Sequence, residues 1–528
     1  MGGKSAAAGD VYFFQRPDTL KEKAKEVLPM AGSDDFGGAR LPSDRLEANV
    51  RYLRGIFSGD DTLQVRHVAS PTEPAARFCL IYTDGMVDNQ LLNEDVIRPL
   101  LQFRFRRGGE DLTAAVGRSV TFADSAERTD RVEKLVQGII YGDTVLLADQ
   151  CRDALVLNTK GWKMRSITEP ESERVLRGPR EGFNESLLTN LTMLHRKIRT
   201  PDLKMHYLTF GRRTRTKACI CYLGSLVNQK VLNELKKRLA KVDIDGVLDT
   251  NYLIEEIRDS PHSAVKTIGA TERPDVVAGR LLEGRVALFL DGTPTVMTVP
   301  HLFAEHFQSD EDYYLNYMFA SIGRILRILA FTISTSLPAI YISMVNFHQE
   351  MLPTPLLISV SSARQGVPFP TALEIVFMLI TFEMLRESGA RMPGIMGQTL
   401  SIVGALVVGQ AAVDAKIVSA PIIIVVALTG ITGLMVPRLK GYVILHRFVL
   451  LFFSCVLGLY GYLLGELALL AGLFGMSSFG VPIMADSYAR GFQDYKDLVF
   501  RAPWKDMLRR PQFLSPDKVR QKGGGKPS

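Results

Sequence analysis

The last third of the chain contains a series of long apolar stretches, which constrain the fold more than any other feature. Residues 328–345 include no charged side chain, and a helix needs about 20 mostly apolar residues to cross a bilayer. Further apolar stretches lie at 371–385, 394–413, 417–436 and 443–474. This pattern predicts a multi-span, all-α transmembrane domain at residues 316–485.

The final stretch, residues 443–474, is longer than one ordinary span requires. Gly458, Gly461 and Gly465 allow it to break into a helical hairpin, which gives six spans. One long, tilted helix is the alternative, and it gives five.

The distribution of charge predicts the orientation. Cytosolic segments beside membrane helices are enriched in Lys and Arg, and basic residues occupy the loop at 437–441 and the tail at 486–528. The first residues carry no apolar run of the kind found in export signals, so we expect the soluble half in the cytosol as well. Because both ends then lie inside, an even number of spans is required, which favours six.

The first 315 residues have a different character. Residues 1–45 are rich in Gly, Ala, Ser and charge, which predicts disorder. Beyond them, short apolar runs predict buried strands at 78–82, 153–157, 205–210, 217–223 and 285–290, with helices at 184–198 and 226–239. Runs at 138–141 and 144–148 flank a Gly-Asp pair and predict a β-hairpin. We therefore expect a soluble α/β or α+β half with two subdomains, residues 46–170 and 171–315.

Composition narrows the possible functions. A net charge of +7 and a pI of about 9.0 suit a protein beside anionic lipid. The sequence lacks the long basic arm that is typical of nucleic-acid binding. The 5 cysteines are scattered and do not form a disulfide framework. Cys219 and Cys221 alternate along a predicted strand, so we interpret them as reduced core residues rather than metal ligands. No catalytic motif is present, and we predict no enzyme activity, cofactor or metal site.

Small residues recur every four positions on the third apolar helix, at Gly397, Ser401, Ala405 and Gly409, with Gly404 beside them. Such a stripe allows another helix to approach closely. The pattern predicts helix packing, and a substrate groove is the functional alternative.

Polar residues within the apolar region are candidates for a pore or a gate. The proline-bounded segment 353–370 carries Ser359, Ser361 and Ser362 and is too short to span. It is either re-entrant against a watery cavity or an ordinary extracytoplasmic loop. Glu374 follows, and intramembrane carboxylates usually face a cavity or a partner. Glu383 is instead expected to pair with nearby charges at the cytosolic interface.

Several segments together resemble one known family, the A subunits of GerA-type spore germinant receptors of endospore-forming bacteria. The resemblance covers about residues 60–520. Its segments are 177–184, 271–275, 281–286, 291–294, 311–314, 366–370, 382–393, 402–413, 478–482 and 501–503. The chain departs from the family in its extended amino terminus and in Ser388, where the family often has Ala. A related class, the A-subunit-like protein of the dipicolinate-channel operon, is less similar at 291–294 and 382–393.

The resemblance implies a receptor subunit in the spore inner membrane that works with a transporter-like B subunit and a lipoprotein C subunit. It also implies nutrient-triggered germination and an A subunit that forms a homo-oligomer and conducts ions, with the soluble half on the cytosolic core side. A small-molecule transporter or a structural scaffold of the receptor complex is the alternative function. A transporter is expected to show matched broken helices in two halves, and the sequence has one proline-rich segment of this kind.

Overall fold

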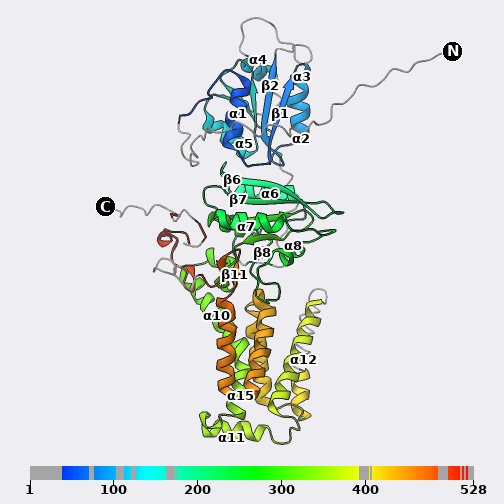
Figure 1. Ribbon diagram of the computed structural model, residues 1–528, viewed down its shortest axis with the longest axis vertical. Helices are drawn as coiled ribbons and strands as arrows, with labels where there is room; N and C mark the ends of the chain where they lie inside the picture. The colour runs from blue at the N-terminus through cyan, green and yellow to red at the C-terminus, as the bar shows by residue number, and fades with distance from the viewer. Residues whose placement is uncertain are drawn as a thin grey trace, which may run out of the picture.

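The computed structural model places three parts one above another, two sheets with their helices and then a bundle of long helices (Figure 1). It describes residues 38–70, 76–102, 112–119, 126–161, 173, 175, 177–391, 404, 407–485, 497–511, 514–515 and 519–520.

The first unit is a five-stranded antiparallel sheet covered on both faces by helices. Its strands are β1 (Leu63–Ala69), β2 (Arg77–Thr83), β3 (Ala126–Thr129), β4 (Thr144–Ala148) and β5 (Ala154–Leu157), in the order β1-β2-β4-β5-β3. One face packs against α1 (Leu46–Ile56) and α5 (Val132–Tyr141). The other face carries α2 (Asn89–Leu91), η1 (Leu92–Ile97), α3 (Arg98–Gln102) and α4 (Leu112–Ser119).

The second unit repeats this arrangement. Its strands are β6 (Leu203–Phe210), β7 (Thr216–Leu223), β8 (Gly269–Thr271), β9 (Val286–Leu290) and β10 (Val296–Val299), in the order β6-β7-β9-β10-β8. All its strand pairs are antiparallel. One face packs against α6 (Leu187–Lys197) and α9 (Pro274–Leu282), and the other against α7 (Gln229–Leu239) and α8 (Thr250–Ile257).

The two units also share their helix-start chemistry. Asp149 follows β4 and accepts a hydrogen bond from the amide of Leu46, the first residue of α1, at 3.2 Å. Asp291 follows β9 and accepts one from the amide of Leu187, the first residue of α6, at 3.0 Å. The same strand order and the same cap indicate that the chain contains two copies of one structural unit.

The β-hairpin prediction at 138–141 and 144–148 was wrong in its first half. Residues 138–141 form the last turn of α5, whereas 144–148 form β4. Leu135 and Ile139, one helical turn apart, are buried on the same face. Gly142 then ends the helix with a φ of 91°, a conformation that glycine adopts readily. Short apolar runs occur both in buried helices and in buried strands, so such a run does not distinguish the two. The other predicted strands and both predicted helices are confirmed.

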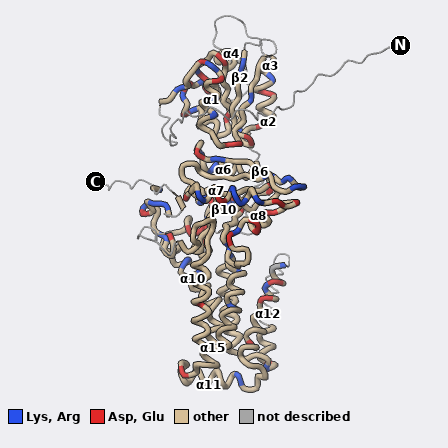
Figure 2. The backbone as a smooth tube through the Cα atoms, viewed as in Figure 1, with Lys and Arg blue, Asp and Glu red and all other residues tan. Residues whose placement is uncertain are grey.

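The helical half extends away from the second unit (Figure 1). Its helices are α10 (Tyr317–Asn346), α11 (Thr354–Ala363), α12 (Thr371–Arg391), residues 407–414, α14 (Ala420–Leu434) and α15 (Lys440–Phe474). Short 3₁₀ turns precede or separate them: η2 (Phe303–Phe307), η3 (Asp310–Tyr313), η4 (Gln349–Met351) and η5 (Pro437–Leu439). Among the described residues, two helical segments, Tyr317–Asn346 and Pro437–Phe474, are long and apolar enough to cross a membrane. The helical half carries few charges (Figure 2).

The long helix α15 is a hairpin. Gly458 has a φ of 62° and a ψ of −139°, which no helix contains. His446 lies 3.1 Å from Glu466, twenty residues later in the sequence, whereas those positions would lie about 30 Å apart on a straight helix. A Cβ atom on Gly461 would lie 2.0 Å from the carbonyl oxygen of Phe453. Residues 440–457 and 459–474 therefore form two arms that pack against each other. Of the two predictions for 443–474, the structure shows the helical hairpin and not the single long helix.

After the helices the chain returns to the second unit. The short strands β11 (Ser477–Ser478) and β12 (Val481–Pro482) precede the tail, whose described part includes η8 (Trp504–Asp506). Phe479, Val481 and Leu514 join the same buried cluster as α7 and α8. The second unit is thus completed by residues that follow the last long helix.

Candidate functional site

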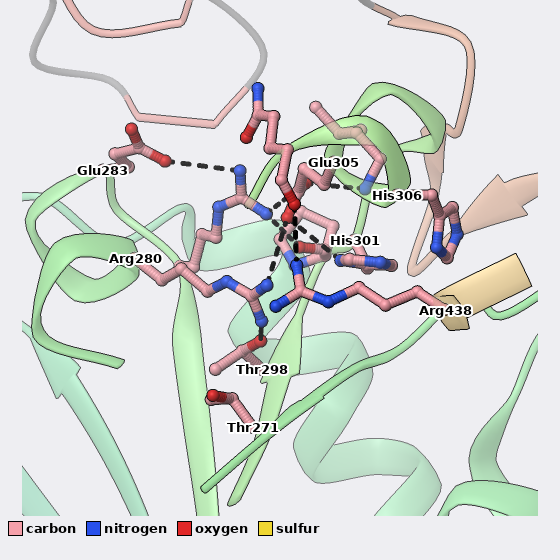
Figure 3. A network of polar contacts seen from close by, with 12 residues as sticks. Thr271, Arg280, Glu283, Thr298, His301, Glu305, His306 and Arg438 are labelled. Carbon is pink, nitrogen blue, oxygen red and sulfur yellow. Dashed lines mark hydrogen bonds and ion pairs between the residues drawn. The ribbon is translucent and has the colours of Figure 1, made fainter. Parts of the chain in front are cut away.

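A buried network of charged side chains joins the second unit to the helical half (Figure 3). It draws on α9, the turn before β9, the strand β10, the η2 turn and the η5 turn between α14 and α15. Its members are Arg280, Glu283, Arg285, Thr298, His301, Glu305, His306 and Arg438.

Glu305 is the centre of this network and is almost fully buried. Its carboxylate forms an ion pair with Arg285, lies 3.7 Å from Arg280, and accepts hydrogen bonds from His301 Nδ1 at 3.0 Å and from the amide of Leu302 at 2.8 Å. Burial alone would raise the pKa of Glu305, but Arg285, His301 and Arg280 together hold that pKa well below its usual value. The carboxylate is therefore charged across the physiological pH range.

The two histidines of the network are neutral. Burial lowers the pKa of both His301 and His306. The rings meet edge to face with 4.7 Å between centroids, and His306 Nε2 donates to the carbonyl of Lys266 at 3.2 Å. The network therefore holds fixed charges on Arg and Glu, with the imidazoles acting as hydrogen-bond partners.

Arg438 connects the helical half to this network. Its Nη2 atom lies 3.0 Å from Asp310 Oδ2 and 3.3 Å from Glu173 Oε1, and its Nη1 donates to the carbonyl of Gln308 at 3.2 Å. Burial would lower the pKa of Arg438, but Asp310 and Glu173 raise it overall. The turn between α14 and α15 is thus fixed to the second unit by a fully charged guanidinium.

A second ion cluster fixes the start of α10. Asp312 is 1% exposed and accepts from Arg324 Nε at 3.0 Å and from Arg327 Nη2 at 2.6 Å. Arg324 also lies 3.0 Å from Asp497 in the tail. Two helices, α10 and α15, therefore enter the bundle from buried ionic anchors, and a displacement of the second unit would act on both.

The first unit has no equivalent of this chemistry at the matching positions. Gly142 and Gly284 end α5 and α9 in the same left-handed conformation, with φ of 91° and 88°, which aligns the two copies. Gly138 and Asp143 then stand where the second unit has Arg280 and Arg285. The two arginines are therefore a specialisation of the copy that contacts the helices.

The predicted pore residues lie at the far end of the helical half. Ser359, Ser361 and Ser362 are exposed on α11, which lies at the end furthest from the sheets (Figure 1). Glu374 is 1% exposed within the single chain. It accepts from the amide of Ser419 at 2.8 Å.

Glu374 therefore caps the amino terminus of α14, where a negative charge is favourable. Its other oxygen lies 4.0 Å from Arg364 Nε. Neither atom of this pair has a hydrogen-bond partner, and neither does Ser419 Oγ.

The predicted packing stripe is described in part. Gly397, Ser401 and Ala405 lie outside the described residues. A Cβ atom on Gly404 would lie 3.2 Å from Leu385 of α12, and one on Gly409 would lie 3.7 Å from Ile423 of α14. Both glycines therefore face neighbouring helices of the same chain.

Leucine at Gly404 or Gly409 is predicted to disrupt assembly while leaving the two sheets folded. A bulky side chain there pushes α12 or α14 of the same chain away, which distorts the helical surface available to another copy. Gly404 has the tighter contact, so its variant should show the larger effect. Chemical cross-linking of oligomers is the measurement, and Gly441→Leu, at a glycine with open space around it, is the control. Unchanged oligomers with normal germination would contradict the packing role.

Two further polar pairs lie inside the helical half. His446 of one α15 arm contacts Glu466 of the other, and Arg447 lies 3.3 Å from Glu383 of α12. Glu383 also pairs with Arg386, as expected from their spacing. Ionisable residues inside apolar helices usually have a functional or assembly role.

Among the described residues, no group of three or more His, Cys, Asp or Glu side chains is arranged to hold a metal ion. Cys219 and Cys221 share one face of β7, fully buried, with 3.8 Å between sulfur atoms.

A pH-dependent effect is expected where the two units meet. His195 at the end of α6 is buried beside Thr62 of the first unit, 3.4 Å from its hydroxyl. Burial lowers the pKa of His195 to about 4 from an ordinary 6.5. The folded form thus binds fewer protons than the unfolded form, so the stabilisation is complete above pH 6.5 and is lost as pH falls towards 4.

At 1.36 kcal/mol per pKa unit the effect of His195 reaches roughly 3 kcal/mol. Thermal unfolding at pH 7 and pH 4.5 is the measurement. The His195→Gln variant should lose less stability on acidification than the unmodified chain, whereas His67→Gln, at an exposed histidine of β1, should behave as the unmodified chain does. Equal acid sensitivity of the two variants would contradict the assignment.

The family model of the Bacillus/Clostridium GerA spore germination protein matches residues 51–513. The chain belongs to the GerA family of spore germination proteins. It is 39% identical to spore germination protein KA of Bacillus subtilis over 91% of this chain and 89% of that protein. It is 37% identical to spore germination protein B1 of the same organism, over 92% of this chain and all of that protein.

A solved structure with detectable similarity is the N-terminal domain of the A subunit of the Bacillus megaterium spore germinant receptor GerK3. The two are 30% identical, with a TM-score of 0.40, over 50% of this chain and 98% of that chain.

The sequence did not predict the ion network as a site. His301 and Glu305 lie four residues apart at the η2 turn, whereas Arg438 lies in the η5 turn, more than a hundred residues away. The available signal was local: Arg280 and Arg285, with Glu283 between them, interrupt the mostly apolar stretch 276–290 that runs from α9 into β9, and buried arginines need charged partners.

Proposed function

We propose that this chain is the A subunit of a nutrient germinant receptor in the spore inner membrane, and that it acts with the receptor's B and C subunits to start germination. Membership of the GerA family is the observation that carries this proposal. The solved relative is named as a domain of such an A subunit.

The helical half is proposed to cross the membrane six times, with both termini on the cytosolic core side. Large apolar side chains stay exposed along α10, α12, α14 and α15, among them Phe319, Phe377, Ile424 and Leu467. An exposed apolar surface of this kind is typical of contact with lipid. The hairpin in α15 supports an even number of crossings, because it returns the tail to the side of the second unit.

Each arm of that hairpin is about 24–27 Å long at 1.5 Å per residue, close to the roughly 30 Å apolar core of a bilayer. Single cysteines at exposed positions test the topology. A cysteine at Ser361 on α11 should react with a membrane-impermeant maleimide added from outside, and one at Lys505 in the tail should react only after permeabilisation. Labelling of the tail from outside would exclude this arrangement.

The receptor is proposed to conduct ions as a homo-oligomer, with Ser359, Ser361, Ser362 and Glu374 near one mouth of a shared pore. Hydroxyl and carboxylate groups are the types that line cation pathways. Because Glu374 is buried within one chain, its contribution to a pore requires the start of α14 to move away from it. The unpartnered oxygen of Glu374 and the long contact to Arg364 are consistent with such a weakly held arrangement.

Glu374→Gln is expected to reduce cation conductance or selectivity at least tenfold while assembly stays intact. Single-channel recording of the purified chain in planar bilayers is the measurement. Glu387→Gln, at a half-exposed carboxylate of α12, is the control and should conduct normally. Lost assembly with unchanged selectivity of any residual current would reject the pore role.

A structural scaffold of the receptor complex is the second candidate, favoured by the ionic anchors of α10 and α15 and by the burial of Glu374. The two candidates differ in one result. A scaffold without a pore gives no current in the same bilayer recording, yet the spores still need the chain for their response to a panel of amino acids and sugars.

A further inference from the structure

The first turns of α10 and the described part of the tail form one surface beside the second unit. The amide of Arg501 donates to Ser321 Oγ at 3.0 Å, and Arg501 Nη1 donates to the carbonyl of Leu315 at 2.7 Å. The guanidinium lies 5.4 Å from the ring centroid of Trp504, and that ring lies 6.0 Å from the ring of Tyr313. The tail is therefore held against α10, and these contacts fix the position of Trp504.

Large apolar and aromatic side chains stay exposed on this surface. Phe500 and Trp504 of the tail are 61% and 50% exposed. Tyr317 and Met318 precede Ser321 by four and three residues, so they lie on the side of α10 that the tail contacts, and they are 39% and 59% exposed. The surface thus presents two aromatic rings with polar atoms, Tyr317 and Trp504, together with purely apolar side chains.

The surface lies at a boundary in the distribution of charge. Charged residues are frequent in the two sheets and sparse along α10 and α15, and α10 begins where these regions meet (Figure 2). Exposed apolar side chains continue along α10 at Ile322, Ile325, Leu326 and Leu329. Tryptophan and tyrosine are enriched where a bilayer meets water, and this surface has that position relative to the apolar helices.

Two cationic side chains follow Trp504 closely in the tail. Lys505 and Arg509 are both exposed, and neither forms an ion pair with a carboxylate of the described residues. Asp506 is exposed between them in the sequence, so two cations stand beside one carboxylate. Arg510 instead donates through Nε to the carbonyl of Leu282 at 2.8 Å, which directs it to the second unit.

We propose that residues 500–509 and the first turns of α10 bind the anionic lipid headgroups of the surrounding bilayer. Phe500 and Trp504 lie at the level where acyl chains meet headgroups, because an aromatic ring with one polar atom is favourable there. Lys505 and Arg509 contact lipid phosphates, since an ammonium and a guanidinium are attracted to an anionic membrane surface. The inference rests on the proposed crossing of the membrane by the helical half and adds the class of lipid that the chain recognises.

Binding of lipid at this place acts on the ionic anchor of α10. Asp497 of the same tail segment lies 3.0 Å from Arg324, which also pairs with Asp312 at 3.0 Å. A headgroup held by Lys505 and Arg509 therefore stabilises the arrangement in which the tail covers the start of α10, because it binds that arrangement preferentially.

The fluorescence of Trp504 tests the proposal directly. The chain contains two tryptophans, Trp162 and Trp504, so the Trp162→Phe variant of the full chain reports on Trp504 alone. It is reconstituted into phosphatidylcholine nanodiscs that contain phosphatidylglycerol, with either lipid brominated near the headgroup end of its acyl chains as a quencher.

At equal mole fractions, brominated phosphatidylglycerol is expected to quench Trp504 with an apparent affinity about fivefold higher than brominated phosphatidylcholine, the effect of one cationic side chain near an anionic surface. Lys505→Gln/Arg509→Gln should abolish this preference. Arg51→Gln/Arg54→Gln, at two exposed arginines of α1, removes the same charge elsewhere and should leave the preference unchanged. Circular dichroism and the melting temperature establish that both double variants are folded.

A second tryptophan position separates this proposal from the membrane topology. Leu467→Trp, at a side chain of α15 that is 70% exposed, is placed in a chain with Trp162→Phe and Trp504→Phe, and lipids brominated deep in the acyl chain should quench it. Absence of that quenching would overturn both the crossing and the lipid surface. Quenching at position 467 with none at Trp504, or equal quenching of Trp504 by the two lipids, would overturn the lipid surface alone.

Discussion

Glu305→Gln is expected to loosen the junction between the second unit and the helices and to lower stability by about 3–5 kcal/mol, the usual range when one partner of a buried ion pair is removed. The amide has nearly the same size as the carboxylate, so packing is preserved. Arg285 then remains buried opposite a neutral amide, and Arg280, which lies 3.7 Å from the carboxylate in the unmodified chain, also loses its negative partner. The effect is electrostatic and comes from the charges left behind.

Thermal unfolding of the purified chain measures this loss, together with proteolysis at the junction around residues 300–312, which is buried or half-buried in the intact fold. Glu256→Gln, at an exposed carboxylate of α8, is the matched control. The double variant Arg285→Met/Glu305→Leu should recover part of the lost stability, because both charges are then absent. A melting temperature for Glu305→Gln equal to that of the control would refute the role of the network.

Gly461→Ala is expected to separate the two arms of the α15 hairpin. The added methyl group would lie 2.0 Å from the carbonyl oxygen and 2.6 Å from the carbonyl carbon of Phe453. The clash is with backbone rather than with a flexible side chain, so the whole arm must move. Overpacking of a well-packed interior costs about 1–3 kcal/mol, and we expect a value at or above the top of that range.

Gly472→Ala is the control for this experiment, since it makes the same chemical change on the same arm with nothing within 4 Å of the new methyl group. Alanine is better than glycine inside a helix by about 1 kcal/mol, so the control should be slightly stabilised. The two variants are therefore expected to shift the melting temperature in opposite directions. Parallel shifts would argue against tight packing of the arms.

Much of the fold could be predicted because it depends on local patterns. Apolar runs identified the buried strands β2, β7 and β9, and the glycine at 458 suggested the break in the last helix. The apolar run at 138–141 was wrongly predicted as a strand, because four residues do not distinguish the two-residue period of a strand from the 3.6-residue period of a helix. The duplication was missed for a similar reason: it resides in strand order and caps, and only weakly in the residues themselves.

The candidate sites depended on contacts distant in sequence. Glu374 was selected from the sequence as a carboxylate in an apolar helix, but its partner in the fold is the amide of Ser419, which lies 45 residues later in the sequence. Likewise, Arg438 belongs to a basic loop by composition, yet Asp310 and Glu173 hold it in a partly buried ionic contact. The residue types thus indicated which charged side chains lie in apolar surroundings. The tertiary structure determined which of these side chains contact one another.

The return of the tail to the second unit has a consequence for how the chain is made. Among the described residues, the buried clusters of the first unit use only those between Leu41 and Leu157, so that unit can close early during synthesis. The second unit includes Phe479, Val481 and Leu514 in its interior. Domains generally fold in the order in which the ribosome releases them, but one part of this interior is completed out of that order. The apolar surface that Phe479, Val481 and Leu514 cover stays open until every long helix has been synthesised, and a chain truncated among those helices leaves it exposed to solvent.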